Sequence, residues 1–389
     1  MRNILILTQE LYPDRIGGSA KVAWQQAKSL ASLKYNVSIV TGSDVEETKF
    51  VNNIQIISYI NTNSKSLSDL KQGKQIIAKQ IANNNYDLVI IHHPYIGKAF
   101  LNLKKNIPYI YMFHASTALE TKWQGMDIES RHKLLGRIFK PYFVYYTKRI
   151  ENKLLIKAKQ IWSLSNFSDN IIKKLYPRIG SKIQRVPYIL ELNKFLPAED
   201  KNKLREEFNV NSKDVIAITV RRLVPRMGLE WLIKSIPAII KKHKTFKLLI
   251  IGNGYLKENL NILIKKNNLG GKVILLGRLP ETTLIKYLQL ADIFILPTLA
   301  YEGFGLATVE SLAASLPVIG TNIGATPEII NAFNKNLLLQ NIDSPALLNC
   351  IDYCLINKKN LAVSARQFSE NNYGDDNNKI FAKLLDKVF

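Results

Sequence analysis

Short apolar runs alternate along the chain with longer segments in which apolar residues recur at helical spacing. The first half contains four runs rich in Ile, Val and aromatic residues, which predict buried strands at 4–7, 37–40, 88–91 and 109–113. The segments between them, such as 20–33, have the period of an amphipathic helix. Because strands that are buried on both faces read as unbroken apolar runs, the alternation predicts parallel β-α-β units.

The second half repeats this alternation, with predicted strands at 215–220, 247–251, 273–276, 293–296 and 318–320. A chain of 389 residues is too long for one ordinary core, so we expect two Rossmann-like, doubly wound α/β domains that face each other across a cleft. The predicted boundaries are an N-terminal domain at 1–192, a polar linker at 193–212, a C-terminal domain at 213–372, and a last helix at 373–389 that packs back towards the first domain.

Composition and charge narrow the class of protein. No apolar run approaches the roughly 18 residues that span a bilayer, and the N-terminus does not read as a signal peptide. The two cysteines, Cys350 and Cys354, are expected to be buried thiols, which favours a cytoplasmic protein. The net charge of +23 predicts an anionic partner, although a codon bias towards Lys, Asn and Ile is an alternative source of part of it. No nucleic-acid-binding motif accompanies the charge.

Two glutamates, Glu302 and Glu310, stand at a predicted strand-to-helix junction. Gly303 and Gly305 lie between them, and glycines allow the backbone N–H groups to approach a ligand closely. A loop acid, a run of free amides and a second acid one turn into the helix can hold an anion joined to a polyol, as in a nucleotide-sugar. The alternative is a pair of solvated acids on a loop and a helix face.

Polar residues also follow other predicted strands. Arg222 and Arg226 follow the strand at 215–220, where guanidinium groups can bind a diphosphate bidentately; a basic surface turn is the alternative. His114 ends the strand at 109–113, as a candidate catalytic group or a satisfied hydrogen-bonding residue. No Asp-x-Asp motif ends a strand, so we expect arginines, amides and helix dipoles, and no metal or other cofactor, to balance a diphosphate.

The segment 131–160 contains nine Lys or Arg residues and one acid, interleaved with aromatic and aliphatic residues. Such a segment suits an anionic membrane surface, and we select Arg137, Lys140, Lys148 and Arg149 as candidate membrane contacts. A pair of core-facing helices with a solvated basic face is the alternative.

Together these motifs resemble the retaining glycosyltransferases of the GT-B fold, most closely glycosyltransferase family 4, over nearly the whole chain. The resemblance implies that Glu302 contacts the donor sugar near the reacting carbon and that Glu310 binds the ribose hydroxyls. It further implies that the donor's sugar and phosphates face a run of backbone amides, at Gly303, Phe304, Gly305 and Leu306.

The resemblance extends to other positions. It places His114 near the donor sugar, Gly17 and Gly18 against the donor phosphate and the acceptor, and Arg278 and Leu279 at the base. The turn at 324–328 resembles the family's Gly-Gly-x-Pro-Glu motif.

There are two departures from the family pattern. The family motif Gly-Arg-Leu-x-x-x-Lys-Gly corresponds to 221–228, and Met227 occupies the position of the lysine. We expect Arg226 to supply the second cation instead. The family's linker signature is also altered, at 186–191.

The implied activity is retaining, metal-independent transfer of a sugar from a nucleoside-diphosphate sugar to an acceptor hydroxyl. The leaving phosphate then deprotonates the acceptor on the same face of the sugar, and no protein nucleophile is needed. The basic segment favours a lipid-linked or surface saccharide as acceptor and a peripheral location on the inner face of the cell membrane. A GT-B sugar phosphorylase, a nucleotide-sugar epimerase and a non-catalytic binding subunit are the alternatives.

Overall fold

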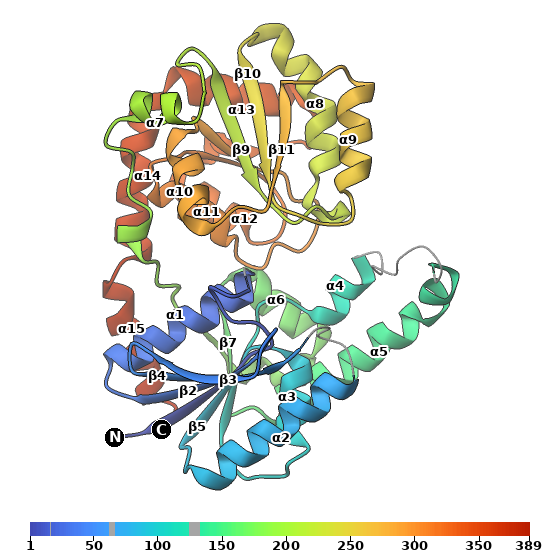
Figure 1. The fold of residues 1–389 in the computed structure, drawn as a ribbon, viewed down its shortest axis with the longest axis vertical. Helices are drawn as coiled ribbons and strands as arrows, with labels where there is room; N and C mark the ends of the chain where they lie inside the picture. The colour runs from blue at the N-terminus through green and yellow to red at the C-terminus, as the bar shows by residue number, and fades with distance from the viewer. Residues whose placement is uncertain (16, 62–66, 124–132) are drawn as a thin grey trace. The chain divides into compact units, whose positions relative to one another are not determined.

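The computed structural model describes residues 1–15, 17–61, 67–123 and 133–389, with side chains described throughout except at 67–70, 121–123 and 133–140. The chain divides into two compact units (Figure 1). The first contains Met1–Lys122, the described part of Ile128–Ile189, and Asp375–Phe389. The second contains Trp123 and Leu190–Gly374.

An eight-stranded sheet forms the centre of the first unit, in the order β3-β4-β2-β1-β5-β6-β7-β8. Its strands are parallel except for β3, which pairs antiparallel with β4. The bounds are β1 Asn3–Leu7, β2 Asn36–Ser43, β3 Glu47–Val51, β4 Ile54–Ile60, β5 Leu88–Ile91, β6 Tyr109–Met112, β7 Gln160–Ser163 and β8 Ile183–Arg185. All four strands expected in this half are present, and the structure adds β3, β4, β7 and β8.

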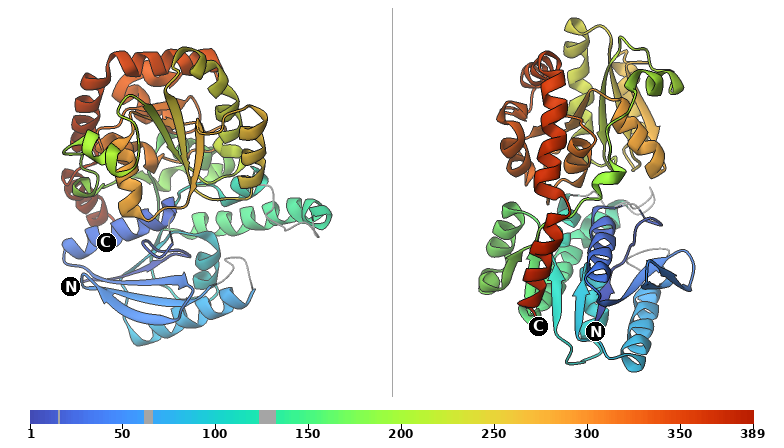
Figure 2. Two further views of the ribbon diagram at one scale, coloured as in Figure 1. Left: turned by 45° about the horizontal axis from the view of Figure 1, so that its top comes forward. Right: turned by 90° about the vertical axis from the view of Figure 1, so that its left-hand side faces the viewer.

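Helices cover both faces of this sheet (Figure 2). They are α1 Gly18–Ser32, α2 Leu67–Asn83, α3 Pro94–Leu101, α4 Thr117–Trp123, α5 Lys133–Lys157, α6 Asn166–Leu175, the 3-10 turn η1 Pro177–Lys182, and α15 Asp376–Asp386. The last helix returns to this unit, where the ring of Phe381 packs edge-on against Trp162 with centroids 5.4 Å apart.

A six-stranded, fully parallel sheet forms the centre of the second unit, in the order β11-β10-β9-β12-β13-β14. Its strands are β9 Val215–Val220, β10 Phe246–Ile251, β11 Val273–Gly277, β12 Ile293–Leu296, β13 Val318–Thr321 and β14 Leu338–Leu339. Its helices are α7 Lys201–Glu207, α8 Leu229–Lys242, α9 Lys257–Lys266, α10 Glu281–Leu290, α11 Leu306–Ala313, α12 Thr326–Asn334, α13 Ser344–Ile356 and α14 Lys358–Tyr373, with the 3-10 turns η2 Leu192–Lys194, η3 Pro225–Met227 and η4 Lys335–Leu337. The expected doubly wound α/β architecture is therefore confirmed in both halves.

Each sheet reverses its strand order beside its first strand. In the first unit β1 lies between β2 and β5, and in the second unit β9 lies between β10 and β12. Loops that leave two such neighbouring strands turn in opposite directions, which opens a crevice at their carboxyl ends. The crevice at β9 and β12 is therefore the place in the second unit where polar loop residues can surround a ligand.

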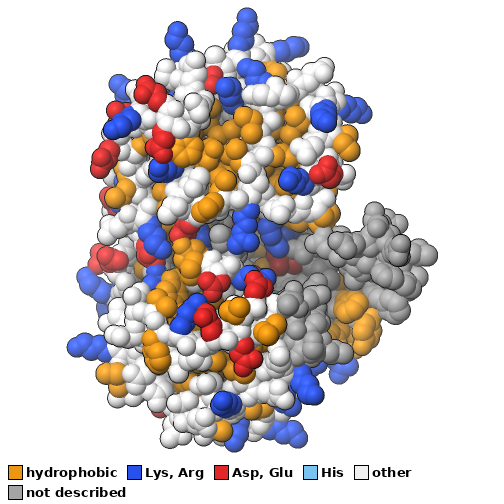
Figure 3. Space-filling view, viewed as in Figure 1, with side chains coloured by type: hydrophobic (Ala, Val, Ile, Leu, Met, Phe, Trp, Pro, Cys, Tyr) orange, Lys and Arg blue, Asp and Glu red, His pale blue; other side chains and the backbone are white. Residues whose placement is uncertain are grey.

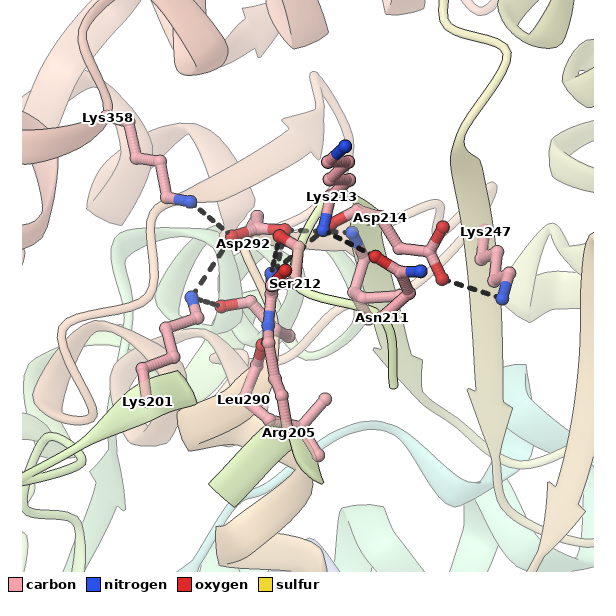
Figure 4. A network of polar contacts seen from close by, with 12 residues as sticks. Lys201, Arg205, Asn211, Ser212, Lys213, Asp214, Lys247, Leu290, Asp292 and Lys358 are labelled. Carbon is pink, nitrogen blue, oxygen red and sulfur yellow. Dashed lines mark hydrogen bonds and ion pairs between the residues drawn. The ribbon is translucent and has the colours of Figure 1, made fainter. Parts of the chain in front are cut away.

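A buried carboxylate joins the start of β12 to the helices behind the second sheet (Figure 4). Asp292 accepts from the backbone N–H of Ile216 at 2.9 Å and pairs with the three cations Arg205, Lys201 and Lys358 at 2.6, 3.1 and 2.7 Å. Burial alone would raise the pKa of Asp292, but the surrounding cations outweigh burial and lower that pKa to about 2. This network ties α7 and α14 to the sheet.

Candidate active site

The carboxyl ends of β9 and β12 bring together residues that are far apart in sequence. Arg221 directly follows β9, while Thr298 and Glu302 lie in the loop after β12. The two strands pair in parallel register, with Ile293 opposite Ala217. Loop residues from both strands therefore meet at the point where the strand order reverses.

Glu302 is held in this crevice by Arg221 and Thr298. Arg221 Nη2 forms an ion pair with Glu302 Oε2 and also donates to Thr298 Oγ1. The Thr298 hydroxyl donates to the same carboxylate oxygen at 3.0 Å. Burial by itself would raise the pKa of Glu302, but the Arg221 ion pair, with smaller contributions from Arg226 and Thr298, gives a net lowering of that pKa. Glu302 is therefore an ionised carboxylate at neutral pH.

The glycine-containing loop between β12 and α11 adopts backbone conformations that suit close approach to a ligand. Tyr301 has a φ of +55° and Gly305 a φ of +97°, both in the left-handed region. Gly305 precedes the first turn of α11, and its carbonyl accepts from the N–H of Thr308 at 2.9 Å. The ring of Phe304 packs edge-on against Tyr373 of α14, with centroids 6.1 Å apart. The loop that carries Gly303 to Leu306 is thus fixed from its helical side.

Glu310 lies in α11 and is 5% exposed. The helix is short, and the Arg366 guanidinium donates to the carbonyl of Ala313 at its end at 2.9 Å. The amino-terminal end of α11, where the helix dipole is positive, adjoins the loop that carries Glu302. The first turn of α11 contains no acidic residue that would offset this positive charge.

Arg226 supports the same loop from within the protein. It belongs to η3, is 5% exposed, and its Nη1 donates to the carbonyl of Tyr301 at 3.0 Å and more weakly to that of Ala300 at 3.4 Å. Arg222 is exposed and stands at the carboxyl end of β9. Their assignment to a diphosphate stays a prediction.

In the first unit, His114 contacts a second histidine. His92 Nδ1 lies 3.0 Å from His114 Nε2, and the two residues follow the neighbouring strands β5 and β6. Burial lowers the pKa of His114 to about 4, and burial together with His114 lowers the pKa of His92 well below its ordinary value. Both rings are therefore neutral at pH 7 and share one hydrogen bond.

The surroundings of His92 indicate which ring donates. Its Nε2 is buried and has no hydrogen-bond partner among the described residues. A buried N–H without a partner is rarer and more costly than a buried acceptor without one. We therefore assign the proton of His92 to Nδ1, which donates to His114 Nε2. It follows that neutral His114 carries its own proton on Nδ1, where it can be donated to a ligand.

A buried acid fixes the turn that follows His114. Glu151 of α5 accepts from Ser116 Oγ at 3.0 Å, from the backbone N–H of Thr117 at 2.6 Å and from the hydroxyl of Tyr176 at 2.7 Å. Burial raises the pKa of Glu151 in spite of these hydrogen bonds. Glu151 is thus a structural acid of the first unit.

Two further glycine-containing segments carry predicted donor contacts. Gly17 directly precedes α1 with extended backbone, and its carbonyl accepts from the N–H of Lys21 at 3.0 Å. Gly18 is exposed at the start of that helix. In the second unit Gly277 ends β11 with a φ of +72°, Arg278 after it is exposed, and Leu279 is half-buried. The proposed roles of these residues also stay predictions.

The exposed face of α5 is aromatic and basic. Tyr142, Phe143 and Tyr145 are 62%, 40% and 59% exposed, and Lys148 and Arg149 are exposed beside them. The face that follows Phe143 at helical spacing is buried farther along the helix, through Thr147, Ile150 and Leu154. The side chains of Arg137 and Lys140 lie outside the described residues. The helix extends outward from the body of its unit in Figure 1. Part of it packs in the core, and the membrane role of its exposed residues stays a prediction.

No described helix is long and apolar enough to cross a membrane. Lys and Arg side chains occur across the visible face of each unit, interleaved with uncharged side chains (Figure 3). Both cysteines are free and buried, as expected.

Several of these contacts were not anticipated from the sequence. Arg221, Thr298 and His92 are not among the site residues predicted from the sequence. One signal was available for Arg221: a second arginine stands where the family motif has glycine.

Two models of known protein families together match most of the chain. Residues 16–193 match the family model "Glycosyltransferase Family 4", and residues 200–375 match "Glycosyl transferases group 1". The chain is 24% identical to the "uncharacterized glycosyltransferase MJ1607" of Methanocaldococcus jannaschii, over 84% of this chain and 82% of that protein.

Two further proteins are informative. A GDP-mannose-dependent monoacylated alpha-(1-6)-phosphatidylinositol monomannoside mannosyltransferase of Corynebacterium glutamicum is 30% identical over 43% of this chain and 46% of that protein. Among solved structures, Anabaena HepE in complex with UDP and glucose matches with a TM-score of 0.78 and 17% identity, covering 100% of both chains. That likeness shows the GT-B fold.

Proposed function

Because the chain belongs to glycosyltransferase family 4, a family of retaining enzymes that use nucleoside-diphosphate sugars, we propose that it transfers a sugar to a hydroxyl of a lipid-linked or surface saccharide without a metal ion. The observation that carries the catalytic part is the half-buried, ionised Glu302, held by Arg221 and Thr298 next to the glycine loop. A fixed carboxylate at the end of neighbouring parallel strands can orient a sugar and stabilise positive charge that develops at its anomeric carbon.

In the proposed step the bond from the anomeric carbon to the diphosphate oxygen breaks, and the acceptor oxygen bonds to that carbon on the same face. The acceptor proton passes to a phosphate oxygen of the leaving group, so the protein provides no nucleophile. Glu302 and the Nδ1–H of His114 orient the sugar. Arg222, with the amides of the glycine loop, stabilises the diphosphate as its charge increases, and Arg226 supports that loop from within the protein.

The remaining donor contacts follow from the family resemblance. We assign the ribose to Glu310, the base to the backbone around Arg278 and Leu279, and the phosphate and acceptor to the loop at Gly17 and Gly18.

The acceptor is proposed from a separate set of observations. The Corynebacterium relative acts on a phosphatidylinositol mannoside, and α5 of this chain presents the exposed rings of Tyr142 and Tyr145 on one side with Lys148 and Arg149. Aromatic and basic residues on one helix face suit the headgroup region of an anionic membrane, where each basic residue contributes about 1 kcal/mol. We therefore place the enzyme at the inner face of the cell membrane, as a peripheral protein.

The activity is tested with a panel of nucleoside-diphosphate sugars. A bound donor raises the unfolding temperature by mass action, so thermal shift identifies the donor before any acceptor is known. Transfer is then followed by NMR of the product, and an inverted anomer would contradict the proposal. A requirement for free phosphate would indicate a phosphorylase, and an altered sugar formed without acceptor would indicate an epimerase.

Membrane association is tested by flotation with liposomes with and without anionic lipid. We expect the chain to float only with anionic lipid, and Lys148→Ala/Arg149→Ala to weaken this association. Lys265 and Lys266 are exposed lysines at the end of α9, in the other unit, and their double alanine variant is a charge-matched control. Flotation that is independent of lipid charge would contradict the membrane proposal. The proposed transfer activity is tested separately, by the donor panel.

A further inference from the structure

The turn after β9 lacks a cation at one position of its motif. Met227 stands where the family motif has lysine, and it is buried, with 6% of its surface exposed. The backbone there is tightly fixed, because Gly228 has a φ of +74° and a Cβ at this position would lie 1.8 Å from the carbonyl oxygen of Pro297. The substitution at 227 therefore removes a charge from a turn that has little freedom to rearrange.

A second arginine at the other end of the same motif restores a charge. Arg221 stands where the motif has glycine, and its side chain is 8% exposed. Its backbone is packed closely, since a Cβ on Gly252 would lie 1.8 Å from the Arg221 carbonyl oxygen. The backbone of Arg221 is thus held at the strand end, and its side chain extends to the β12 loop, where Nη2 reaches Thr298 and Glu302.

The contacts of Arg221 leave part of its guanidinium available. Nη2 binds Thr298 and Glu302, while Nε is buried and has no hydrogen-bond partner among the described residues. A buried N–H without a partner destabilises a protein unless a ligand or water satisfies it. Arg221 therefore combines a fixed orientation with an unused donor beside Glu302.

Arg226 is the other candidate for the missing cation, and its contacts differ. Its Nη1 donates to the carbonyls of Ala300 and Tyr301, which commits this group to supporting the loop. Arg221, by contrast, reaches the carboxylate of Glu302 itself. The cation nearest to Glu302 by direct contact is thus Arg221.

We propose that Arg221 takes the place of the lysine that is missing at position 227 and binds the donor's diphosphate while its Nη2 holds Glu302. This inference rests on the proposed function. It gives one side chain two roles, because the guanidinium fork can bind a carboxylate through one edge and a phosphate oxygen through the other. It also explains why an arginine and a methionine occur together in this motif: Arg221 supplies the positive charge that is lost where Met227 replaces lysine.

The test exchanges the two positions in the full-length protein. The variants are Arg221→Gly, Arg221→Lys, and the double variant Arg221→Gly/Met227→Lys, with Lys265→Ala as the surface control. Binding of UDP, GDP, ADP and inorganic pyrophosphate is measured by calorimetry. These probes lack the transferred sugar, so their affinity is insensitive to a role of Arg221 in orienting Glu302 towards that sugar, and pyrophosphate reports on the diphosphate alone. Circular dichroism and the unfolding temperature identify variants that fail to fold.

We expect Arg221→Gly to weaken the best nucleoside diphosphate at least ten-fold, Arg221→Lys to weaken it less, and the double variant to return to within about three-fold of the wild type. Unchanged affinity in a folded Arg221→Gly, or no recovery in a folded double variant, would overturn the inference. Should Arg221→Gly not fold, Arg221→Lys and Met227→Lys are compared instead, and affinity unaffected by either change would equally overturn it. If the wild type binds none of the probes, it is the proposed function that fails.

Discussion

Gly324 lies directly against the backbone of Glu302. A Cβ at position 324 would lie 2.5 Å from the carbonyl oxygen of Glu302 and 2.7 Å from its nitrogen, and Gly324 has a φ of +66°. The next residue, Ala325, donates its N–H to the same carbonyl at 2.8 Å. The turn between β13 and α12 therefore positions the backbone of Glu302, while Arg221 and Thr298 position its carboxylate.

Replacing Gly324 with alanine is expected to displace the loop that carries Glu302. The added methyl group meets backbone atoms, which cannot move aside as a flexible side chain can, and the left-handed conformation adds about 1 kcal/mol of strain. We expect sugar transfer to fall at least a hundred-fold, measured with the donor found by thermal shift. The control is Gly270→Ala, since a Cβ there meets no atom within 4 Å. Equal activity of the two variants would show that this turn does not position the catalytic loop.

The role of Glu302 predicts a separation of binding from turnover. In Glu302→Gln the side chain keeps its shape and loses its charge, so we expect UDP affinity to change less than three-fold and transfer to fall by about 3 kcal/mol in activation free energy, or more than a hundred-fold. Calorimetry and a radiolabelled transfer assay measure the two effects. Full transfer activity in Glu302→Ala would rule out the proposed scheme.

Glu310 is predicted to act in binding. If it holds the ribose hydroxyls, Glu310→Ala removes interactions that are made equally in the ground state and the transition state. The KM for the donor is then expected to rise about ten-fold while kcat stays within a few-fold. A KM that does not change would contradict the ribose assignment.

The histidine pair predicts a loss of stability in acid. The pKa of His114 is lowered to about 4 in the folded protein, whereas the unfolded chain takes up protons near the ordinary value of 6.5. The unfolded state therefore binds more protons between these pH values, and stability falls as pH decreases from about 6.5 to 4, by roughly 3 kcal/mol for His114 alone. Urea unfolding at a series of pH values measures this slope. His92→Phe/His114→Phe should reduce it, and a folded double variant with the same slope would exclude the pair as its source.

The same lowered pKa bears on activity. With its pKa at about 4, His114 remains neutral from pH 8 down to about 5. Protonation of His114 should therefore not reduce kcat/KM near pH 6.5. We expect the wild type to have no acidic limb there that disappears in His114→Asn. Such a limb would mean that the imidazole titrates during turnover.

The sequence predicted the regular parts of the fold because these depend on local pattern. The nine expected strands are present, since each contains a continuous apolar run; most are buried on both faces, whereas β11 lies at the edge of its sheet and is partly exposed. The strand β3 was missed because it lies at the edge of the sheet and alternates between half-buried and exposed positions, which leaves no continuous apolar run. β7, at Gln160–Ser163, is only four residues long and begins with a polar side chain.

The site was predictable only as far as it is local. Glu302, its glycines and Glu310 lie within one short segment, so a motif could identify them. The ion pair between Arg221 and Glu302 joins residues that are 81 positions apart. It exists because β12 pairs with β9 across the reversal of strand order, and that adjacency is a property of the topology, which no local pattern shows. The contact of His92 with His114 depends in the same way on the pairing of β5 with β6.

The network around Asp292 leads to a prediction about stability that is independent of the site. Asp292 is buried and its carboxylate balances Arg205, Lys201 and Lys358, so Asp292→Asn leaves the buried Arg205 without a counterion. Breaking a buried ion pair on one side destabilises a protein by about 3–5 kcal/mol, and we expect a loss of that order in urea unfolding. The matched control is Asp376→Asn, because the ion pair of Asp376 with Lys379 is solvent-exposed and contributes little.

The pH dependence of the same network has a defined sign. The pKa of Asp292 is lowered from its ordinary value of 3.8 to about 2, so its contribution is fully present above pH 3.8 and is lost as pH falls through 2. The contribution amounts to roughly 2 kcal/mol, and Asp292→Asn should lack it. UDP affinity at neutral pH is expected to be the same in Asp292→Asn and the wild type under conditions where both are folded. Asp292 directly precedes β12, whereas the proposed donor contacts in the β12 loop follow the opposite, carboxyl end of this strand. A variant that unfolds as the wild type does but binds UDP more weakly would instead assign Asp292 to the site.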